Sequence, residues 1–249
     1  MKRKILIIPD IHGRTFWKDA VEKTPSDIIV FLGDYLDPYG YEDISWKEAL
    51  QNFDDILNYK RENLDKVILL EGNHDAHYHY LDRWARYGRG SRFNIFNSKK
   101  IKKIFEENED LFRGAAYQER SDNKLYLFTH AGVTDYWLKQ NKLSLPENED
   151  NISDWLCELY SNEEKTPYNI FGDVGRSRGG YSPSGSPMWA DWYDDHYSSS
   201  KYGLEGHEDI YQIFGHTQGM TERIEKYAAC LDCRKAFLLD LEEEKIKEV

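Results

Sequence analysis

The sequence predicts an α/β fold built around a largely parallel β-sheet. Short apolar segments rich in Ile, Val, Leu and Phe recur along the chain, and segments with helical spacing separate the first of them. Apolar runs of this length and composition are typical of buried strands. Because two parallel strands need a long crossover connection, alternating strands and helices favour a parallel sheet.

Five of the apolar segments end in the same way, in a polar cluster that contains Gly together with His or Asp. The segments are residues 4–9, 27–32, 67–70, 125–129 and 210–214. In open α/β sheets, ligands bind at the carboxyl ends of the strands. We therefore expect the fold to gather the five polar clusters at one functional site.

Helices are expected between these strands. Residues 15–22 and 45–63 separate the first three strands, and residues 98–111 place apolar Ile101, Ile104 and Phe105 among charged side chains. This spacing is typical of a surface helix with one apolar face.

The second half of the chain is expected to be poorer in regular structure, with a loop-rich excursion at about 141–209. Residues 141–154 are acidic, and residues 166–206 combine many Gly, Ser, Pro, Tyr and Trp residues with little periodicity. Long segments of this kind inside a domain are often functional loops. The last strands are expected at residues 224–231 and 235–241, followed by a charged tail.

The length and composition predict a single globular domain over residues 1–249. The hydrophobic fraction is 40% and the charged fraction 31%, and we find neither a linker nor a repeat of fixed period. No apolar run approaches the roughly 20 residues of a membrane span. The opening apolar run, residues 4–9, is too short for the core of a signal peptide, so we expect a cytoplasmic protein that does not enter a membrane.

The net charge and the cysteines narrow the class of partner and the compartment. A formal net charge of −12 argues against binding to a nucleic-acid backbone, which requires clustered Lys and Arg. An odd, small number of cysteines, Cys157, Cys230 and Cys233, suits a reducing compartment. Cys230 and Cys233 form a lone C-x-x-C, for which we favour buried thiols over a zinc site.

The side chains at the five strand ends suit divalent cations. The candidate ligands are Asp10, His12, Asp34, Asn73, His130 and His216. Carboxylates, imidazoles and an amide oxygen fit manganese, iron or zinc. They are too many for one cation that must also bind a substrate, so they favour two cations that share a bridging carboxylate. Such a pair, about 3.5–4 Å apart, activates a water as hydroxide and stabilises both ends of a displacement at phosphorus.

These motifs, in this order, resemble those of the calcineurin-like metallophosphoesterase family. They are Asp-x-His at 10–12, Gly-Asp-x-x-Asp at 33–37, Gly-Asn-His-Asp at 72–75, His-Ala-Gly at 130–132 and Gly-His-Thr at 215–217. The resemblance covers most of the chain. It implies a two-layered β-sandwich flanked by helices, with the site at the strand ends, and an enzyme that hydrolyses phosphoesters.

The resemblance also implies a role for each site residue. Asp10 and His12 would bind the first cation and Asp34 would bridge the two cations. The ligands of the second cation would be Asn73, His130 and His216.

His74 would be the catalytic histidine that protonates the leaving group, a step worth about 10²–10⁴ in rate. Asp37 would orient His74 and hold it charged. Asp75 is the alternative residue for that task.

Other details are similar to the Ser/Thr protein phosphatase branch of the family, including its bacterial and phage members. Met188-Trp189-Ala190-Asp191 is similar to the Leu-Trp-Ser-Asp segment of that branch. The branch usually has Arg directly after the second Asp of its Gly-Asp motif, where this chain has Pro38. Pro cannot grip phosphate in a bidentate fork, so the candidate substitutes are Arg14, Arg176 and Arg178.

The leading function is a phosphomonoesterase that acts on a phosphorylated small molecule or a phosphoprotein, with manganese as the expected metal and iron or zinc as alternatives. A phosphodiesterase or a dinucleoside polyphosphate hydrolase is the second hypothesis. Many phosphodiesterases of the family end in Gly-His-x-His, and Gln218 at the place of the final His favours the first hypothesis. A metal-binding scaffold of the same fold is the non-enzymatic alternative, and the presence of every ligand together with His74 argues against it.

Residues outside the motifs are expected to have ordinary structural roles. We expect four histidines, His77, His79, His196 and His207, to lie on the surface. We expect the aromatic residues of the excursion to pack onto the domain, with stacking on a nucleobase as the alternative. These aromatic residues are Tyr181, Trp189, Trp192, Tyr193, Tyr197 and Tyr202.

Overall fold

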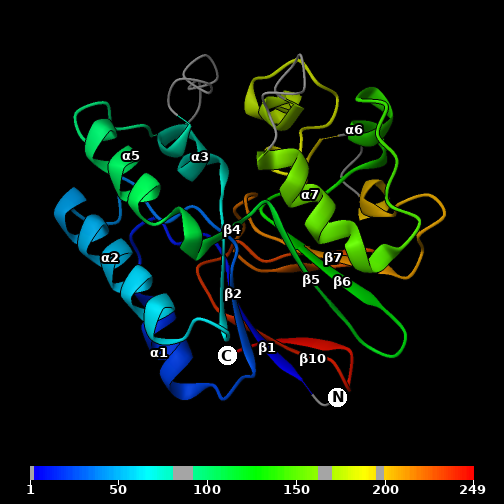
Figure 1. The fold of residues 1–249 in the computed structure, drawn as a ribbon, viewed down its shortest axis with the longest axis horizontal. Coiled ribbons are helices and arrows are strands. Elements are labelled where there is room, and N and C mark those ends of the chain that lie inside the picture. Colours follow the sequence, from blue (N-terminus) through cyan, green and yellow to red (C-terminus); the bar gives the residue numbers. More distant parts are fainter. Residues whose placement is uncertain (1–2, 81–91, 162–169, 195–198) are drawn as a thin grey trace. The chain divides into compact units, whose positions relative to one another are not determined.

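Two β-sheets organise the chain, one in each of two compact units (Figure 1). The computed structural model describes residues 3–80, 92–161, 170–194 and 199–249. The first unit comprises Met1–Arg113 and Arg234–Val249, and the second comprises Gly114–Cys233. That residues 1–249 form a single domain remains a prediction, which this division into two compact units does not test.

The first unit contains a six-stranded mixed sheet in the order β11-β10-β1-β2-β3-β4. Strand β1 pairs in parallel with β2, and β2 pairs in parallel with β3, whereas β10 is antiparallel to both β1 and β11. The strands are β1 (Lys4–Ile8), β2 (Ile28–Phe31), β3 (Val67–Leu70), β4 (Phe112–Gly114), β10 (Phe237–Asp240) and β11 (Lys245–Glu248).

The strands of this sheet follow the apolar pattern of the sequence, with two exceptions, the short strand β4 and the strand at the end of the chain. Ile5 to Ile8 are all buried in β1, as expected of a strand covered on both faces. The expectation that the last strand ends at about residue 241 is wrong, because residues 245–248 of the charged tail form β11. Ile246 is the least exposed residue of this strand, and its neighbours are charged. Charged side chains suit an edge strand because they oppose further strand pairing.

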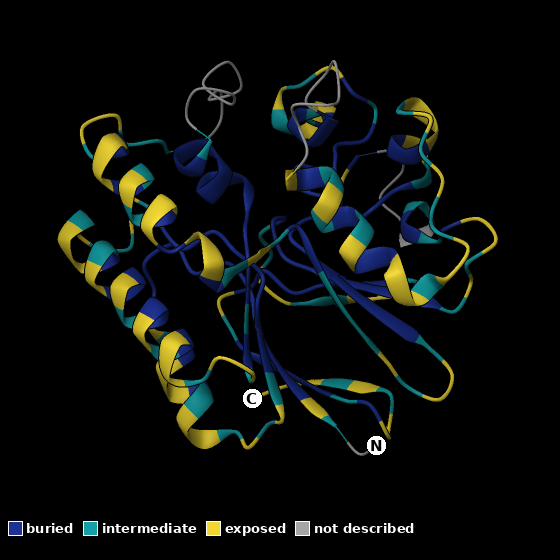
Figure 2. Cartoon of the chain, viewed as in Figure 1, coloured by how far each residue is buried: buried dark blue, intermediate teal, exposed yellow. Residues whose placement is uncertain are grey.

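Helices flank this sheet, and three of them follow the predicted segments. The helices are α1 (Phe16–Lys23), α2 (Trp46–Glu62), α3 (Asn73–His79), α5 (Ser98–Glu107) and the 3-10 helix η1 (Glu109–Leu111). Figure 2 shows the exposed side of α2 turned away from the buried strands of its unit. Helix α3 was not expected, because its sequence is polar and has no apolar period.

Helix α2 shows how local sequence positions an element of this unit. The Ser45 hydroxyl accepts a hydrogen bond from the Glu48 N–H, and the Glu48 carboxylate accepts one from the Ser45 N–H, which completes a capping box. Buried positions recur every three or four residues, so one face of the helix joins the core. These positions are Ala49, Asn52, Phe53, Ile56, Leu57 and Lys60.

The second unit contains a five-stranded mixed sheet in the order β5-β6-β7-β9-β8. Strand β6 is antiparallel to β5 and parallel to β7, which is parallel to β9. The strands are β5 (Ala116–Arg120), β6 (Leu125–Thr129), β7 (Ile210–Phe214), β8 (Arg223–Ile224) and β9 (Ala228–Cys230). The alternation of strands and helices indicated a largely parallel sheet but did not distinguish one sheet from two, and the structure has two, because β6 and β7 belong to a second sheet. Two sheets flanked by helices are consistent with the fold that the family resemblance implies.

The helices of the second unit are short. They are α6 (Asp135–Gln140), η2 (Glu149–Asn151), α7 (Ile152–Ser161), η4 (Ile170–Gly172), η5 (Arg176–Arg178) and η6 (Ser199–Tyr202). Helix α7 begins within the segment expected to be an acidic loop. Its apolar face, formed by Ile152, Leu156 and Tyr160, is buried. None of the helices in the described part of the chain is both long and apolar enough to cross a membrane.

Of the five aromatic residues of this set that the structure describes, Trp189, Trp192 and Tyr202 are buried, as the packing hypothesis predicted, whereas Tyr181 and Tyr193 are exposed. Trp192 and Tyr202 lie in an apolar cluster with Phe214, and their two rings stack at 5.8 Å. Trp189 is buried as well, whereas Tyr181 is 96% exposed. Tyr197 lies outside the described residues.

Candidate metal centre

Three neighbouring parallel strands bring the first group of candidate ligands to one edge of the first sheet. Asp10 and His12 follow β1, Asp34 follows β2, and Asn73 opens α3 directly after β3. The Asp34 carbonyl accepts a hydrogen bond from the His12 N–H at 2.7 Å, which joins the first two loops. The Asp34 carboxylate accepts another from the His74 N–H at 2.9 Å, which joins the second loop to α3.

The side chains of this edge form a buried cluster suited to a cation. His12, Asp34 and His74 each offer a ligand atom, and these atoms lie within 4.8 Å of one another. Carboxylate oxygens of Asp10 and Asp34 also lie within 4.8 Å of each other. Two buried carboxylates at this separation repel each other unless a positive charge lies between them. The donor set therefore fits a divalent cation.

The hydrogen bonds of His12 fix which ring nitrogen can bind a metal. Nδ1 lies 2.8 Å from the Leu36 carbonyl oxygen, and a carbonyl can only accept, so Nδ1 carries the proton. Burial, which outweighs the opposing charge of Asp34, lowers the pKa of His12 well below its ordinary value. The neutral ring therefore presents the lone pair of Nε2, and Nε2 lies 3.5 Å from the Asp34 carboxylate.

The backbone is strained at the residues that carry the motifs. His12, Asp34, Asp37 and His216 adopt positive φ values of 45°, 55°, 61° and 63°. Residues other than Gly reach this region at a cost of about 1–3 kcal/mol, and such residues cluster at functional sites. The strain is a structural signal that these loops are shaped for something other than stability.

The second unit brings two further candidate ligands together. His130 follows β6 and His216 follows β7, and the Gly215 N–H donates to the His130 carbonyl at 2.9 Å. Because β6 and β7 are parallel neighbours, the two imidazoles emerge at the same edge of the second sheet. His130 Nε2 lies 3.1 Å from His216 Nδ1, so two ring nitrogens converge on one point. This arrangement suits a pair of imidazole ligands.

Asp37 and Asp75, the two candidates for orienting His74, have different partners. Asp37 Oδ2 lies 2.5 Å from His74 Nδ1, and the Tyr78 hydroxyl donates to Asp37 Oδ1. The Asp75 carboxylate instead accepts three backbone N–H groups, those of Gly72 at 2.9 Å, Asp34 at 2.6 Å and Tyr35 at 3.0 Å. Asp37 thus contacts the imidazole, and Asp75 shapes the loop that carries Asp34.

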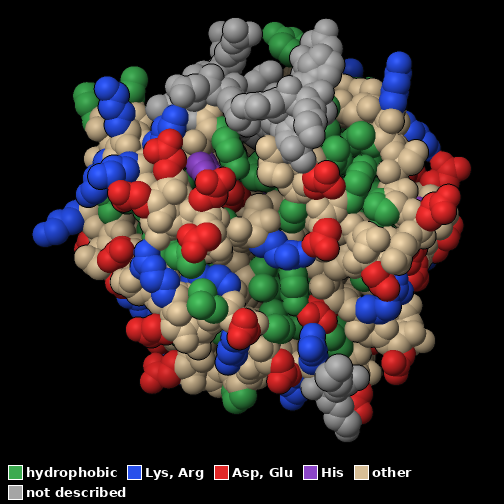
Figure 3. Space-filling view, in the orientation of Figure 1, with side chains coloured by type: hydrophobic (Ala, Val, Ile, Leu, Met, Phe, Trp, Pro, Cys, Tyr) green, Lys and Arg blue, Asp and Glu red, His purple; other side chains and the backbone are tan. Residues whose placement is uncertain are grey.

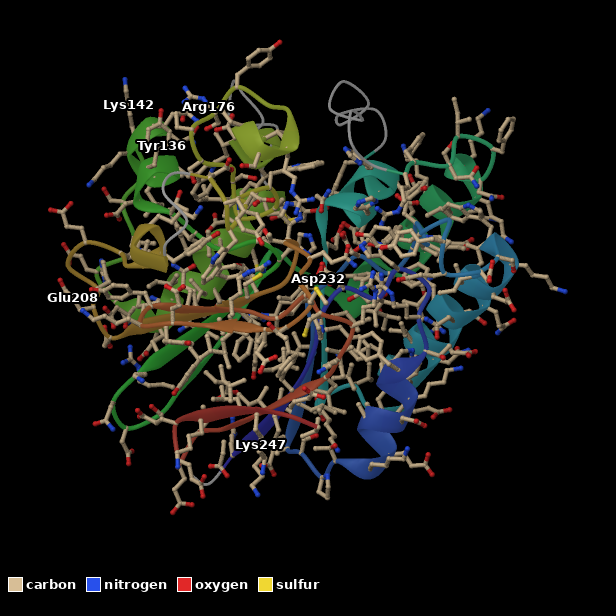
Figure 4. All side chains as sticks on the ribbon, turned by 180° about the vertical axis from the view of Figure 1, so that it is seen from behind. Tyr136, Lys142, Arg176, Glu208, Asp232 and Lys247 are labelled. Atoms are coloured by element: carbon tan, nitrogen blue, oxygen red, sulfur yellow. The ribbon has the colours of Figure 1, made fainter. Side chains whose placement is uncertain are left out.

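The three candidate substrate-binding arginines differ in how far they are already engaged. Arg14 is buried and pairs with both carboxylate oxygens of Glu42, at 2.8 and 3.1 Å. Arg178 donates to the Asp191 carboxylate and to the His216 carbonyl. Arg176 lies exposed on η5 (Figure 4).

Two residues near the cluster were missed by the sequence analysis. Tyr78 lies four residues after His74 in α3, on the same helix face, and contacts Asp37. Arg92 places Nη2 3.1 Å from His12 Nδ1, and its Nε–H donates to the Asp37 carbonyl at 2.8 Å. The i, i+4 spacing from His74 could have marked Tyr78, whereas Arg92 belongs to no motif.

The expectation that the remaining histidines lie on the surface is wrong for two of them. His77 and His79 are buried in α3, because this helix packs on α5 and the His79 ring stacks on Phe105 at 5.4 Å. His79 Nδ1 also lies 3.0 Å from the Glu71 carboxylate. His207 is partly buried and pairs with Glu149 at 2.8 Å, and His196 lies outside the described residues.

The cysteines are free thiols, and two of them are buried. Cys157 is partly exposed, whereas Cys230 and Cys233 are buried, as expected for the lone C-x-x-C. The Cys230 thiol donates to the Gly215 carbonyl at 3.2 Å, next to His216. It thereby helps to hold the loop that carries this histidine.

Comparison with known proteins identifies the family. The calcineurin-like phosphoesterase family model matches residues 3–220. None of the curated proteins matches the chain. The solved structures that it resembles include a protein serine/threonine phosphatase from Saccharomyces cerevisiae with similarity to human phosphatase PP5. The two share 15% identity over 96% of this chain and 73% of that chain, with a TM-score of 0.47.

Two further structures cover nearly all of the chain. One is a hypothetical protein from Pyrococcus horikoshii OT3, with 11% identity, coverage of 99% and 86%, and a TM-score of 0.47. The other is an archaeal phosphodiesterase, with 13% identity, coverage of 99% and 98%, and a TM-score of 0.36. At these identities and TM-scores, the likenesses indicate neither a substrate nor a mechanism for this chain. The family model alone matches most of the sequence, and the chain therefore belongs to the calcineurin-like phosphoesterase family, whose members are hydrolases of phosphate esters.

Proposed function

We propose that this phosphoesterase is a phosphomonoesterase that works with two divalent cations and acts on a phosphorylated small molecule or a phosphoprotein in the cytoplasm. Manganese is the proposed metal, with iron or zinc as alternatives. The proposed ligands are Asp10, His12, Asp34, Asn73, His130 and His216. The observation that carries the proposal is the buried carboxylate of Asp34, which lies within 4.8 Å of a ligand atom of His12 and of a carboxylate oxygen of Asp10.

Asp34 is well placed to be the bridging ligand. One carboxylate oxygen, Oδ2, lies 3.5 Å from His12 Nε2, and the other, Oδ1, accepts the His74 N–H. The His74 N–H therefore holds one carboxylate oxygen, and the other faces the Nε2 lone pair of His12, an arrangement of two acceptors that suits a cation. When bound, the cations supply Lewis acidity and lower the pKa of the attacking water.

His74 is proposed to protonate the leaving-group oxygen. Its Nδ1–H donates to Asp37, so its Nε2 is the atom that can hold the transferable proton. The Asp37 carboxylate fixes the orientation of the His74 ring, and the Tyr78 hydroxyl fixes that carboxylate from the other side. General acid catalysis by a histidine held in this way contributes about 10²–10⁴ in rate.

A phosphodiesterase or a dinucleoside polyphosphate hydrolase is the second candidate, and a metal-binding scaffold of the same fold is the third. Gln218 favours the first candidate, because an amide takes the position of the final histidine that many phosphodiesterases use as a ligand. The complete set of ligands with His74 argues against the scaffold.

We do not propose a nucleic-acid substrate. On the face shown in Figure 3, the described Lys and Arg side chains are scattered among Asp and Glu, without a continuous basic stripe. The net charge of −12 agrees with this distribution. Recognition of a nucleic-acid backbone relies on clustered positive charge.

The test compares para-nitrophenyl phosphate with bis-para-nitrophenyl phosphate in the presence of manganese, for the wild type, Asp34→Asn and His74→Asn. Metal content is measured on the same samples. We expect manganese-dependent monoester turnover that both variants lose, with metal retained in His74→Asn and reduced in Asp34→Asn. Preference for the diester would support the second candidate. Two bound metals without turnover of either ester would support the scaffold, and a wild type that binds no divalent metal would refute the proposal.

A further inference from the structure

We propose that Arg92 is the phosphate-binding residue of this enzyme and that it selects a phosphomonoester. The inference rests on the proposed function. Arg92 would supply the guanidinium that is missing directly after the Gly-Asp motif, where this chain has Pro38.

Three contacts place the Arg92 guanidinium beside the candidate ligands of the first unit. Its Nη2 lies 3.1 Å from Nδ1 and 3.3 Å from Nε2 of His12. Its Nε–H donates to the Asp37 carbonyl at 2.8 Å. Its Cζ lies 3.5 Å from the centre of the Tyr39 ring, a cation–π contact. The guanidinium is thus at the peptide that joins Asp37 to Pro38, although Arg92 is distant in sequence.

The residues that follow Arg92 are fixed to α3, which limits the freedom of the arginine. Phe93 stacks on Tyr78, with ring centres 4.8 Å apart and an angle of 23° between the planes. The Asn94 N–H donates to the Tyr78 hydroxyl at 2.8 Å. The same hydroxyl donates to Asp37, so one tyrosine anchors both the Arg92 segment and the partner of His74. A group held in place in this way loses little entropy when it binds a ligand.

Arg92 is also better placed to bind an anion than the arginine predicted for this unit. Arg14 already uses its fork on Glu42, at 2.8 and 3.1 Å. Among the described residues, no carboxylate pairs with Arg92. The Nη1 atom of Arg92 donates a hydrogen bond to none of the described residues. Nδ1 of His12 carries its own proton, so in His12 only Nε2, 3.3 Å away, can accept a hydrogen bond from Nη2 of Arg92. A planar guanidinium with donors to spare matches two oxygens of one phosphate.

A phosphate-binding guanidinium at Arg92, here called the clamp, favours a monoester over a diester. A terminal phosphate offers three non-bridging oxygens and close to two negative charges near pH 7. A diester offers two non-bridging oxygens and one charge. When two phosphate oxygens bind the guanidinium, only a monoester has a third non-bridging oxygen left for the cations. Removal of Arg92 should therefore weaken the binding of the monoester more than the binding of the diester.

The experiment measures KM and kcat for both para-nitrophenyl esters with manganese, together with inhibition by inorganic phosphate. The variants are Arg92→Ala and Arg92→Lys, and Arg61→Ala is the control, an exposed arginine that contacts Asn58 and Asn108. For Arg92→Ala we expect the monoester KM and the phosphate inhibition constant to rise about 10-fold to 100-fold, as for the loss of a charge-assisted bidentate contact. The kcat and the diester KM should change less than about threefold, and Arg92→Lys should recover part of the loss. Arg61→Ala should match the wild type.

The outcomes separate this inference from the proposed function. If the wild type lacks manganese-dependent turnover, or Asp34→Asn retains it, the proposed function fails. If the wild type is active and Arg92→Ala leaves KM and phosphate inhibition unchanged, or raises both KM values equally, the Arg92 assignment alone is overturned. Should Arg92→Ala unfold, Arg92→Lys decides: a raised monoester KM supports the clamp, and an unchanged one overturns it.

Discussion

Asp37 and His74 contact each other at 2.5 Å, between Oδ2 and Nδ1, although 37 residues separate them in the sequence. Asp37 reaches this contact from a left-handed backbone conformation with a φ of 61°. Its second oxygen accepts the Tyr78 hydroxyl, so both oxygens of a fully buried carboxylate have partners. The loop after β2 and helix α3 are joined through this pair.

The first prediction concerns the Asp37–His74 pair. An amide in Asp37→Asn keeps the shape but replaces the carboxylate that accepts the Nδ1–H of His74, so the ring is no longer held in its orientation. We expect kcat for the monoester to fall by about 10²–10⁴, with metal content unchanged, because only proton transfer is lost. Tyr78→Phe, which removes one hydrogen bond to Asp37, should reduce kcat by less. Steady-state kinetics with metal analysis checks this, and wild-type kcat in Asp37→Asn would contradict the proposed role.

The second prediction concerns Asp75. Its carboxylate accepts the N–H groups of Gly72, Asp34 and Tyr35, and an amide oxygen cannot serve all three as well. Asp75→Asn should lower the free energy of unfolding by about 1–3 kcal/mol, the effect of a buried donor left unsatisfied. It should also weaken manganese binding, because the displaced loop carries Asp34. Urea unfolding and a metal titration measure the two effects, and wild-type values in both would show that Asp75 does not position Asp34.

The third prediction concerns Gly33, which has a φ of +101°. A Cβ at this position would overlap the backbone nitrogen of Gly72 and lie 2.7 Å from the carbonyl carbon of Glu71. Neither backbone atom can move without shifting the motif loops, so Gly33→Ala should destabilise the protein by about 3 kcal/mol or more. Gly40→Ala is the matched control, because a Cβ there meets nothing within 4 Å. Equal melting temperatures for the two variants would refute this account.

The fourth prediction concerns the pH dependence that His77 imposes on stability. Burial lowers the pKa of His77 to about 4, below its ordinary value of 6.5. Between these pH values the unfolded chain binds a proton that the folded chain does not, so the stability contributed by neutral His77 is lost as the pH falls from 6.5 towards 4. Over the whole titration, the free energy of unfolding should fall by about 3 kcal/mol.

The measurement is urea unfolding from about pH 7.5 to about pH 5, a window that spans most of this titration, with a chelator present, for the wild type and His77→Phe. The variant should lose less stability than the wild type on acidification. His79→Gln should behave oppositely: burial opposes the effect, but Glu71 raises the pKa of His79, so this histidine contributes stability at low pH that disappears as the pH rises through its pKa. Parallel pH profiles for wild type and His77→Phe would contradict the prediction.

The sequence by itself determined the family and the positions of the strands that carry the motifs. The strands before Asp10, Asp34, Asn73, His130 and His216 are all present, because a short apolar run bounded by Gly and polar residues encodes a buried strand locally. The capping box at Ser45 fixed the start of α2 in the same local way.

Tertiary structure alone decided which strands share a sheet and which side chains meet. An apolar run does not indicate which strand it pairs with. The division into two sheets and the pairing of the charged strand β11 with β10 could therefore not be predicted from the sequence pattern. Asp75 is adjacent to His74 in sequence, yet successive helical side chains point in different directions, and it is Asp37 that contacts the ring. Arg92 contacts His12 from a segment whose next two residues, Phe93 and Asn94, pack on Tyr78. Contacts between distant residues depend on packing, which no local pattern records.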